Sequence, residues 1–118
     1  MRMKKTTQPK ISETVCTKQV LEYLHKTGIF AWRNNTGVLK GMTGNFVRFG
    51  YPGSSDILGI VPDGRMLCIE VKSANAPFTP KQVEFKGHIE RNNGIYLRVV
   101  SLDDAVEQMN EKYGQKNK

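Results

Sequence analysis

Two carboxylates and one ammonium group, those of Asp56, Glu70 and Lys72, are the side chains of this sequence best placed to carry chemistry. They lie at the open end of a predicted β-hairpin in which two apolar runs are joined by the turn residues 62–65. Folding the hairpin returns Glu70 to the side of Asp56. Because side chains alternate along a strand, Glu70 and Lys72 share one face while Val71 points to the other. Three charges at the edge of an apolar sheet are costly unless they pair or hold a metal ion, so we expect function here.

Oxygen ligands of this kind are typical of a site for Mg²⁺ or Mn²⁺, which one or two carboxylates hold together with water and phosphate oxygens. Asp56 and Glu70 would supply the carboxylates, and the Val71 carbonyl would add a third oxygen. Lys72 would orient an attacking water and stabilise the charge that builds on a phosphate. The alternative is structural. Asp56 would cap a turn, and Glu70 would form a salt bridge with Lys72 on a solvated face, which contributes little to stability.

Glu13 stands at the start of a predicted first helix, in line with the apolar stripe of Cys16, Val20 and Leu24. An acid at that place has two interpretations. It interacts favourably with the helix dipole, an effect of at most about 1 kcal/mol, or it points toward the two carboxylates as a supporting acid or a second-metal ligand.

Gln82 also has two interpretations. With Thr79 it forms the pattern of a capping box, in which the glutamine side chain reaches back to the backbone amide of the capping residue. It shares helical spacing with Phe85 and Ile89, which aims it toward the interior and toward the candidate site. The sequence leaves both interpretations open.

A basic and glycine-rich segment leads up to Asp56. Residues 23–55 include no Asp or Glu. Its glycines allow close backbone approach to a nucleic-acid strand, and Trp32 is expected in the core rather than as a platform for base stacking. The polar side chains read either as a solvated loop or as phosphate contacts, and the candidates for such contacts are Arg33, Asn35, Lys40 and Arg48.

The chain of 118 residues has the size of one domain, and its net charge of +7 favours a polyanionic partner. We expect the domain to span 11–113, between a flexible basic arm at 1–10 and a frayed basic tail at 114–118. The sequence predicts neither a transmembrane helix nor a signal peptide. Cys16 and Cys68 stand in apolar surroundings and are expected to be buried thiols of a cytoplasmic protein rather than a disulfide.

Turn and capping residues divide the sequence into elements. Helices are expected at 12–27, from 79 to about 93, and after Ser101. Strands are expected at 29–33, 57–61, 66–71 and 95–100, and the long loop 34–53 holds one short strand at 46–49. The natural packing for this order is α/β, a short mixed sheet flanked by helices.

The spacing D-(x13)-E-V-K, set by Asp56, Glu70 and Lys72, resembles the PD-(D/E)XK nuclease signature, with Ser55 in the place of the proline. The G-x-x-D start, the P-D-G-R turn and the downstream T-P-x-Q resemble more narrowly the VRR-NUC family, the virus-type replication-repair nucleases, over about residues 12–100. The resemblance implies a restriction-endonuclease-like α-β-β-β-α-β core and a catalytic lysine at Lys72.

The same resemblance implies a supporting acid on the first helix, at Glu13, and a glutamine beside the active site, at Gln82. It also implies a metal-dependent endonuclease that uses Mg²⁺, with Mn²⁺ able to substitute, and that selects branched, Holliday-junction-like DNA. A phage origin and a cytoplasmic setting would suit such an enzyme.

A homodimer would present two active sites to such a junction. Two other functions stay open, namely a nuclease that prefers flaps, nicks or RNA, and a non-catalytic nucleic-acid-binding module that uses the basic loop and tails. Candidate aromatic residues for the dimer interface are Trp32, Phe46, Phe49 and Tyr51.

Overall fold

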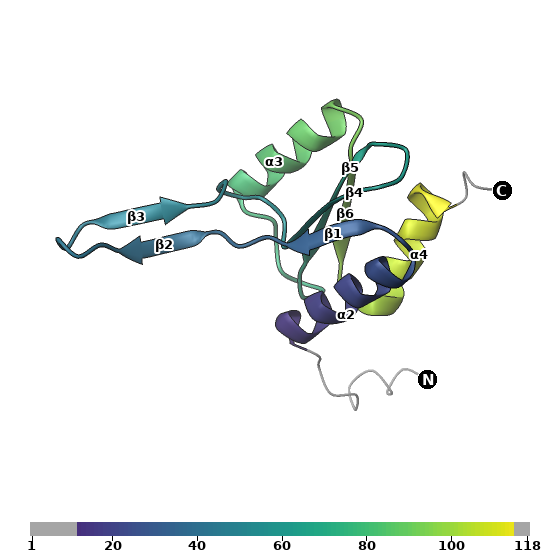
Figure 1. Cartoon of the computed structure of the whole chain (residues 1–118), viewed down its shortest axis with the longest axis horizontal. Coiled ribbons are helices and arrows are strands. Elements are labelled where there is room, and N and C mark those ends of the chain that lie inside the picture. The colour runs from purple at the N-terminus through teal and green to yellow at the C-terminus, as the bar shows by residue number, and fades with distance from the viewer. Residues whose placement is uncertain (1–11, 115–118) are drawn as a thin grey trace.

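A computed structural model describes residues 12–114 of the chain, so the predicted arm at 1–10 and residues 115–118 of the predicted tail lie outside the described residues. Three helices and six strands follow one another along the described part (Figure 1). In chain order they are α2 (Glu13–Lys26), β1 (Phe30–Arg33), β2 (Gly37–Lys40), β3 (Phe46–Phe49), β4 (Ile57–Ile60), β5 (Met66–Val71), α3 (Pro80–Arg91), β6 (Ile95–Val99) and α4 (Leu102–Lys112).

The helices begin at the capping residues that the sequence predicts. The Ser12 hydroxyl accepts a hydrogen bond from the Val15 amide at the start of α2, and the Ser101 hydroxyl accepts one from the Asp104 amide at the start of α4. At the start of α3, both halves of the predicted capping box are present between Thr79 and Gln82. These three predictions of helix starts are confirmed.

Four strands form one mixed sheet in the order β1-β4-β5-β6. β1 pairs antiparallel with β4, and β4 pairs antiparallel with β5 through the hairpin that residues 62–65 close. β6 joins β5 in parallel after the crossover through α3. The elements α2, β1, β4, β5, α3 and β6 reproduce the predicted α-β-β-β-α-β core, and the mixed α/β fold is confirmed.

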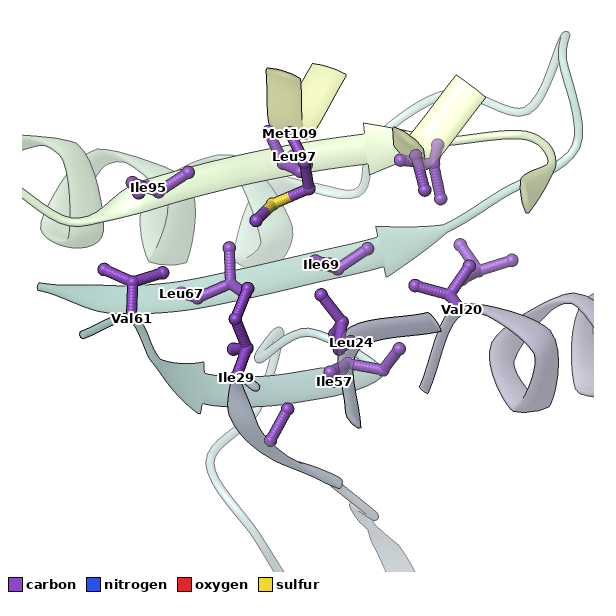
Figure 2. Packing of buried hydrophobic residues seen from close by; sticks show 14 of the residues in the cluster. Val20, Leu24, Ile29, Ile57, Val61, Leu67, Ile69, Ile95, Leu97 and Met109 are labelled. Carbon is purple, nitrogen blue, oxygen red and sulfur yellow. The ribbon is translucent and has the colours of Figure 1, made fainter. Parts of the chain in front are cut away.

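Helices cover the sheet on both faces. Val20 and Leu24 of α2 and Met109 of α4 converge on strand residues such as Ile57 and Ile69 in the main core, which Figure 2 shows from close by. On the opposite face, α3 packs over β5 and β6 in a smaller cluster that Cys68, Phe85, Ile89 and Tyr96 form. The predicted stripe of α2 and the inward face of α3 are therefore both buried.

The segment 34–53, predicted as a loop with one strand, is more ordered than expected. β2 and β3 pair antiparallel into a two-stranded ribbon that projects from the sheet (Figure 1). The prediction of a strand at 46–49 is confirmed, and β2 is an element that the prediction missed. The ribbon is inserted between the first and second strands of the core.

The prediction that Trp32 belongs to the core is wrong. Trp32 is 41% exposed and lies 5.2 Å, between ring centroids, from Phe30, which is 67% exposed. Both side chains belong to β1, the strand at the edge of the sheet. α3 packs against β6 on that face of the sheet, which leaves the aromatic pair on the edge strand open to solvent.

Cys16 and Cys68 are free, buried thiols, as predicted. Burial raises the pKa of Cys16 and raises that of Cys68 to about 12. Within residues 12–114, no helix combines the length and apolar character that a membrane crossing requires.

Candidate active site

The β-hairpin brings Asp56 to the end of β5, as its register requires. Ile57 pairs with Ile69, so the residue before β4 faces the last residues of β5. The Val71 amide donates a hydrogen bond of 2.8 Å to Asp56 Oδ2. One carboxylate oxygen of Asp56 is therefore fixed by the backbone of the neighbouring strand. Oδ1 carries no hydrogen bond from the part of the chain that the structure describes.

Asn34 holds the segment that leads to Asp56. Its backbone amide donates to the Asp56 carbonyl at 2.8 Å, and its side-chain Nδ2 donates to Ser54 Oγ at 2.7 Å and to the Ser55 carbonyl at 2.9 Å. Asn34 directly follows β1, so these bonds lock the end of the edge strand to the start of β4. Sequence reasoning did not single out Asn34, because its partners lie about twenty residues away along the chain.

Glu70 is 5% exposed, which is rare for a carboxylate. Its Oε2 accepts a hydrogen bond of 2.9 Å from Gln82 Nε2, while its Oε1 is buried with no partner among the described residues. Burial, followed by the nearby charge of Asp56, raises the pKa of Glu70 to about 7. The site therefore contains a buried carboxyl group with one oxygen that accepts no hydrogen bond from the described residues.

The pKa of Asp56 is raised as well, again chiefly by burial. The hydrogen bond from the Val71 amide opposes this shift, and so do the positive charges of Arg33 and Lys72, while the charge of Glu13 adds to it. Burial thus favours the protonated state of both Asp56 and Glu70, and the charge of Asp56 adds to the shift of Glu70.

Lys72 lies at the same rim, one residue beyond the end of β5, where its amide donates to the Val99 carbonyl at 3.0 Å. Its charge lowers the pKa values of Glu70 and Asp56 and so acts on both carboxylates. Across residues 12–114, no ion pair within 4.0 Å links Lys72 to Glu70. The alternative in which these two residues form a simple surface salt bridge is not what the structure contains.

Glu13 lies at the exposed rim of the site rather than inside it. Its Oε2 accepts a hydrogen bond of 3.2 Å from the Ser73 amide, directly after Lys72. It also stands in the first turn of α2, where the helix dipole favours an acid. Its charge reaches the carboxylates of Asp56 and Glu70 and raises the pKa of each. Glu13 therefore has the placement at the helix start, and it acts on the two acids through its charge from the rim rather than by pointing into the site.

Gln82 has both of its predicted placements. Its Oε1 accepts from the Thr79 amide at 2.9 Å in the capping box, and its Nε2 donates to Glu70 Oε2. The Gln82 side chain therefore caps the start of α3 and at the same time hydrogen-bonds the buried carboxylate of Glu70.

Arg98 is a second residue that sequence reasoning missed. The parallel register pairs Arg98 with Glu70, and its charge lowers the pKa of that acid. Its guanidinium donates to the carbonyls of Ser73 and Ala76 and lies 4.9 Å from the centre of the Phe78 ring. Arg98 thus holds the loop between β5 and α3, which connects Lys72 to Gln82. The only signal in the sequence is one charged residue in an otherwise apolar strand.

The candidate phosphate-binding residues are spread from the site outward. Arg33 ends β1 near enough to Asp56 for its charge to lower the pKa of that acid. Asn35 is exposed where the ribbon begins, and Lys40 and Arg48 lie exposed on the ribbon itself. The structure brings Arg33 to the site and places the other three along the segment that leaves it.

The acids fit a hard divalent cation, which protein sites commonly hold through one or two carboxylates. Glu70 Oε1 is buried without a partner among the described residues, and burial raises both pKa values despite the nearby positive charge of Lys72. A cation at Asp56 and Glu70 would relieve both conditions. Within the described residues no three His, Cys, Asp or Glu side chains gather closely enough to ligate one ion, so the remaining ligands would be the predicted Val71 carbonyl, water and phosphate.

A comparison with solved structures supports the architecture. The chain is similar to a structure described as a VRR_NUC domain, with a TM-score of 0.60 and 20% sequence identity over 86% of this chain and 96% of that one. No family model and no curated protein matches the sequence. The chain therefore has the fold of a VRR_NUC domain, and the predicted resemblance is confirmed at the level of the fold.

Proposed function

We propose that the protein is a metal-dependent nuclease that hydrolyses phosphodiester bonds in DNA. The observation that carries the proposal is the buried Glu70 beside the half-buried Asp56, at the end of a hairpin with Lys72 next to them. Their fold is that of a VRR_NUC domain. A site of two acids and one lysine at the ends of two inner strands suits chemistry on a phosphate better than any structural role.

In the proposed reaction each residue has a separate task. Asp56 and Glu70, together with the Val71 carbonyl, would hold the divalent cation, which is Mg²⁺ with Mn²⁺ able to substitute for it. When bound, this ion stabilises charge on the phosphate and lowers the pKa of water. Lys72 donates hydrogen bonds that orient the attacking water and stabilise the developing negative charge. Gln82 keeps Glu70 in position through its 2.9 Å hydrogen bond, and Glu13 supports the rim through the Ser73 amide.

A non-catalytic nucleic-acid-binding module is disfavoured by the same two acids. Without a cation, Asp56 and Glu70 would repel a phosphate that approached Arg33 and Lys72. A protein that only binds the backbone would gain nothing from burying a carboxylate as deeply as Glu70.

The finer proposal concerns substrate and assembly. We infer that the nuclease selects branched DNA as a symmetric homodimer, because one site cuts one strand and a two-fold axis relates the two cuts of a four-way junction. Exposed aromatic residues are available for such an interface. They are Trp32, Phe46, Phe49 and Tyr51, which are between 41% and 69% exposed.

One incubation series tests the proposed function. Purified protein is mixed with linear, nicked, flapped and four-way DNA and with RNA, in Mg²⁺, in Mn²⁺ and in chelator. We expect strand cleavage only with the divalent ion, and fastest on the four-way junction. Faster cleavage of flaps, nicks or RNA than of the four-way junction would support the nuclease proposal but change the substrate assigned to it. Binding without cleavage of any of these substrates would leave the non-catalytic module as the function.

A further inference from the structure

The β2–β3 ribbon, residues 37–49, has two faces of different chemistry. In its antiparallel register Val38 pairs with Arg48, and Lys40 pairs with Phe46. Paired residues lie on the same face of a sheet, and residues two apart along a strand do too. Both cations of the ribbon therefore stand on one face, which we call the cationic face and which consists of Val38, Lys40, Phe46 and Arg48.

The opposite face carries no charge. Leu39 pairs with Val47, and Gly37 pairs with Phe49, whose ring lies so close to Gly37 that a Cβ there would be 2.8 Å from it. Random placement along a two-stranded ribbon would divide two cations between the faces as often as not. Because both cations lie on one face and the other face is uncharged, only the cationic face attracts anions.

The two cations are also free to bind. Among the described residues neither Lys40 nor Arg48 forms an ion pair or a side-chain hydrogen bond, and both are exposed. No Asp or Glu occurs between residues 23 and 55, so no acid in this segment competes for them. A partner with negative charge at regular spacing matches this face better than a protein surface of mixed charge.

The ribbon starts and ends at the candidate active site. It leaves the sheet after Arg33 and returns just before Asp56, and Asn34 ties the two ends together. On the return path Gly53, with a φ of 84°, lies against the Lys81 carbonyl in the first turn of α3, where a Cβ would collide. The root of the ribbon is thus fixed to the elements that carry Asp56 and Gln82.

We propose that the cationic face of the ribbon binds the sugar-phosphate backbone of the DNA duplex next to the bond that is cut. The proposal rests on the proposed nuclease function for the position of that bond. A two-stranded β-ribbon has the width that the major groove admits, and Lys40 and Arg48 would contact phosphates on its walls. Because the root is fixed at the site, this contact sets where along the duplex the acids act.

Binding is measured by fluorescence anisotropy with a labelled linear duplex and a labelled four-way junction in chelator, where no cleavage occurs. We expect Lys40→Ala and Arg48→Ala each to weaken affinity on the order of three- to tenfold and to lower the slope of log affinity against log salt by about one. Arg48→Lys should keep the slope. Circular dichroism checks that each variant keeps the parent fold.

The matched controls are neighbours on the opposite face, Leu39→Ala and Val47→Ala, and a distant exposed lysine, Lys18→Ala on α2. All three should bind as the parent does. Parent-like binding by Lys40→Ala and Arg48→Ala, or equal weakening by Lys18→Ala, would overturn the proposal. Equal weakening by Leu39→Ala and Val47→Ala would point to a protein contact through the ribbon instead, and would overturn it too.

Cleavage separates this proposal from the proposed function. In single-turnover cleavage the two ribbon variants should lose apparent affinity, while Lys18→Ala should keep the apparent affinity and the rate of the parent. A parent that binds DNA through the ribbon but cuts nothing in Mg²⁺ would reject the nuclease and keep the ribbon contact. If the parent cuts DNA, and the ribbon variants bind and cut as well as the parent, the ribbon contact is rejected and the nuclease is kept.

Discussion

Gln82 Nε2 donates a hydrogen bond of 2.9 Å to Glu70 Oε2, while the Oε1 of the same side chain accepts one from the Thr79 amide. The start of α3 and the end of β5 are thereby joined through one amide group, with one end on a helix cap and the other on a buried acid. An amide is suited to this position because it donates and accepts at once. A carboxylate in its place could not donate to ionised Glu70.

Replacing Gln82 should affect two properties that can be measured separately. Gln82→Ala should lower the free energy of unfolding by about 1 kcal/mol through the cap and weaken Mn²⁺ binding about 10- to 100-fold, because Glu70 loses its orienting partner. Thr79→Ala is the matched control, since it removes the other half of the cap and leaves the bond to Glu70. Thermal melts and calorimetric titration read the two effects. Equal Mn²⁺ affinity in both variants would assign Gln82 to the cap alone.

Lys72→Ala should abolish cleavage and leave the fold and metal affinity nearly intact. The side chain is half-buried at the rim of the site. Its proposed role is to orient water and stabilise charge on the phosphate, and it does not pack in the core. We expect a loss of single-turnover rate on the order of 100- to 1,000-fold or more. Circular dichroism and Mn²⁺ titration serve as checks on fold and site, and Lys18→Ala serves as the control. Cutting by Lys72→Ala near the parent rate would remove this lysine from the mechanism.

Asp56→Asn and Glu70→Gln should each weaken divalent-ion binding by on the order of tenfold or more, because each deletes a charged oxygen ligand and keeps the size of the side chain. Isothermal titration with Mn²⁺ measures the change. Asp103→Asn, at an exposed acid in the first turn of α4, is the control. If both site variants bind Mn²⁺ as tightly as the parent, the metal site has been assigned to the wrong residues.

The raised pKa of Glu70 predicts how stability depends on pH in the absence of metal. Its folded value of about 7 exceeds the ordinary value of 4.5, so the folded state binds the proton more tightly than the unfolded state. The stability that this protonation contributes is therefore complete below pH 4.5 and is lost as pH rises through about 7. A shift of this size corresponds to roughly 3 kcal/mol, and the raised pKa of Asp56 acts in the same direction.

Chemical denaturation in chelator across this range should show the fall in stability, and Glu70→Gln should flatten it. Mn²⁺ affinity should change in the opposite sense and rise with pH, because the ion competes with the proton. A metal-free protein whose stability rises steadily from pH 4.5 to 7 would contradict the burial of a neutral Glu70.

The features predicted correctly from sequence are those set by short-range patterns. The hairpin of β4 and β5 follows from two apolar runs around a turn. The capping residues Ser12, Thr79 and Ser101 mark where the three helices begin. Because Asp56 directly precedes β4 and Glu70 lies near the end of β5, the hairpin alone brings the two acids together.

The features missed depend on contacts between distant segments. β2 is a four-residue strand beside glycines, and it exists because β3 pairs with it. Trp32 is exposed because β1 lies at the edge of the sheet, away from the β6 strand that α3 covers. Arg98 reaches the site through the parallel register of β5 and β6, which no local pattern reports. Strand order is the missing information in all three cases.

The proposed dimer is the last expectation to test, and the structure narrows its candidate residues. Tyr51 packs on Phe85 of its own chain, at 5.9 Å between ring centroids, and Phe46 shares the cationic face with Lys40. Trp32, on the open edge strand, and Phe49, on the uncharged face of the ribbon, remain as candidates. An edge strand with exposed aromatic side chains is a surface that a second copy can cover.

Light scattering at micromolar protein, free and with a four-way junction, should give the mass of a dimer. Trp32→Ser and Phe49→Ser should each weaken dimerisation by about 1–3 kcal/mol, because large apolar side chains at an interface centre dominate its energy. Val83→Ser, at an exposed apolar position on α3, should leave the dimer intact. The two interface variants should also lose the preference for four-way over linear DNA, since that preference needs two sites related by a two-fold axis. A parent protein that is monomeric in both states and cuts linear duplex equally well would overturn the dimer and leave the nuclease proposal standing.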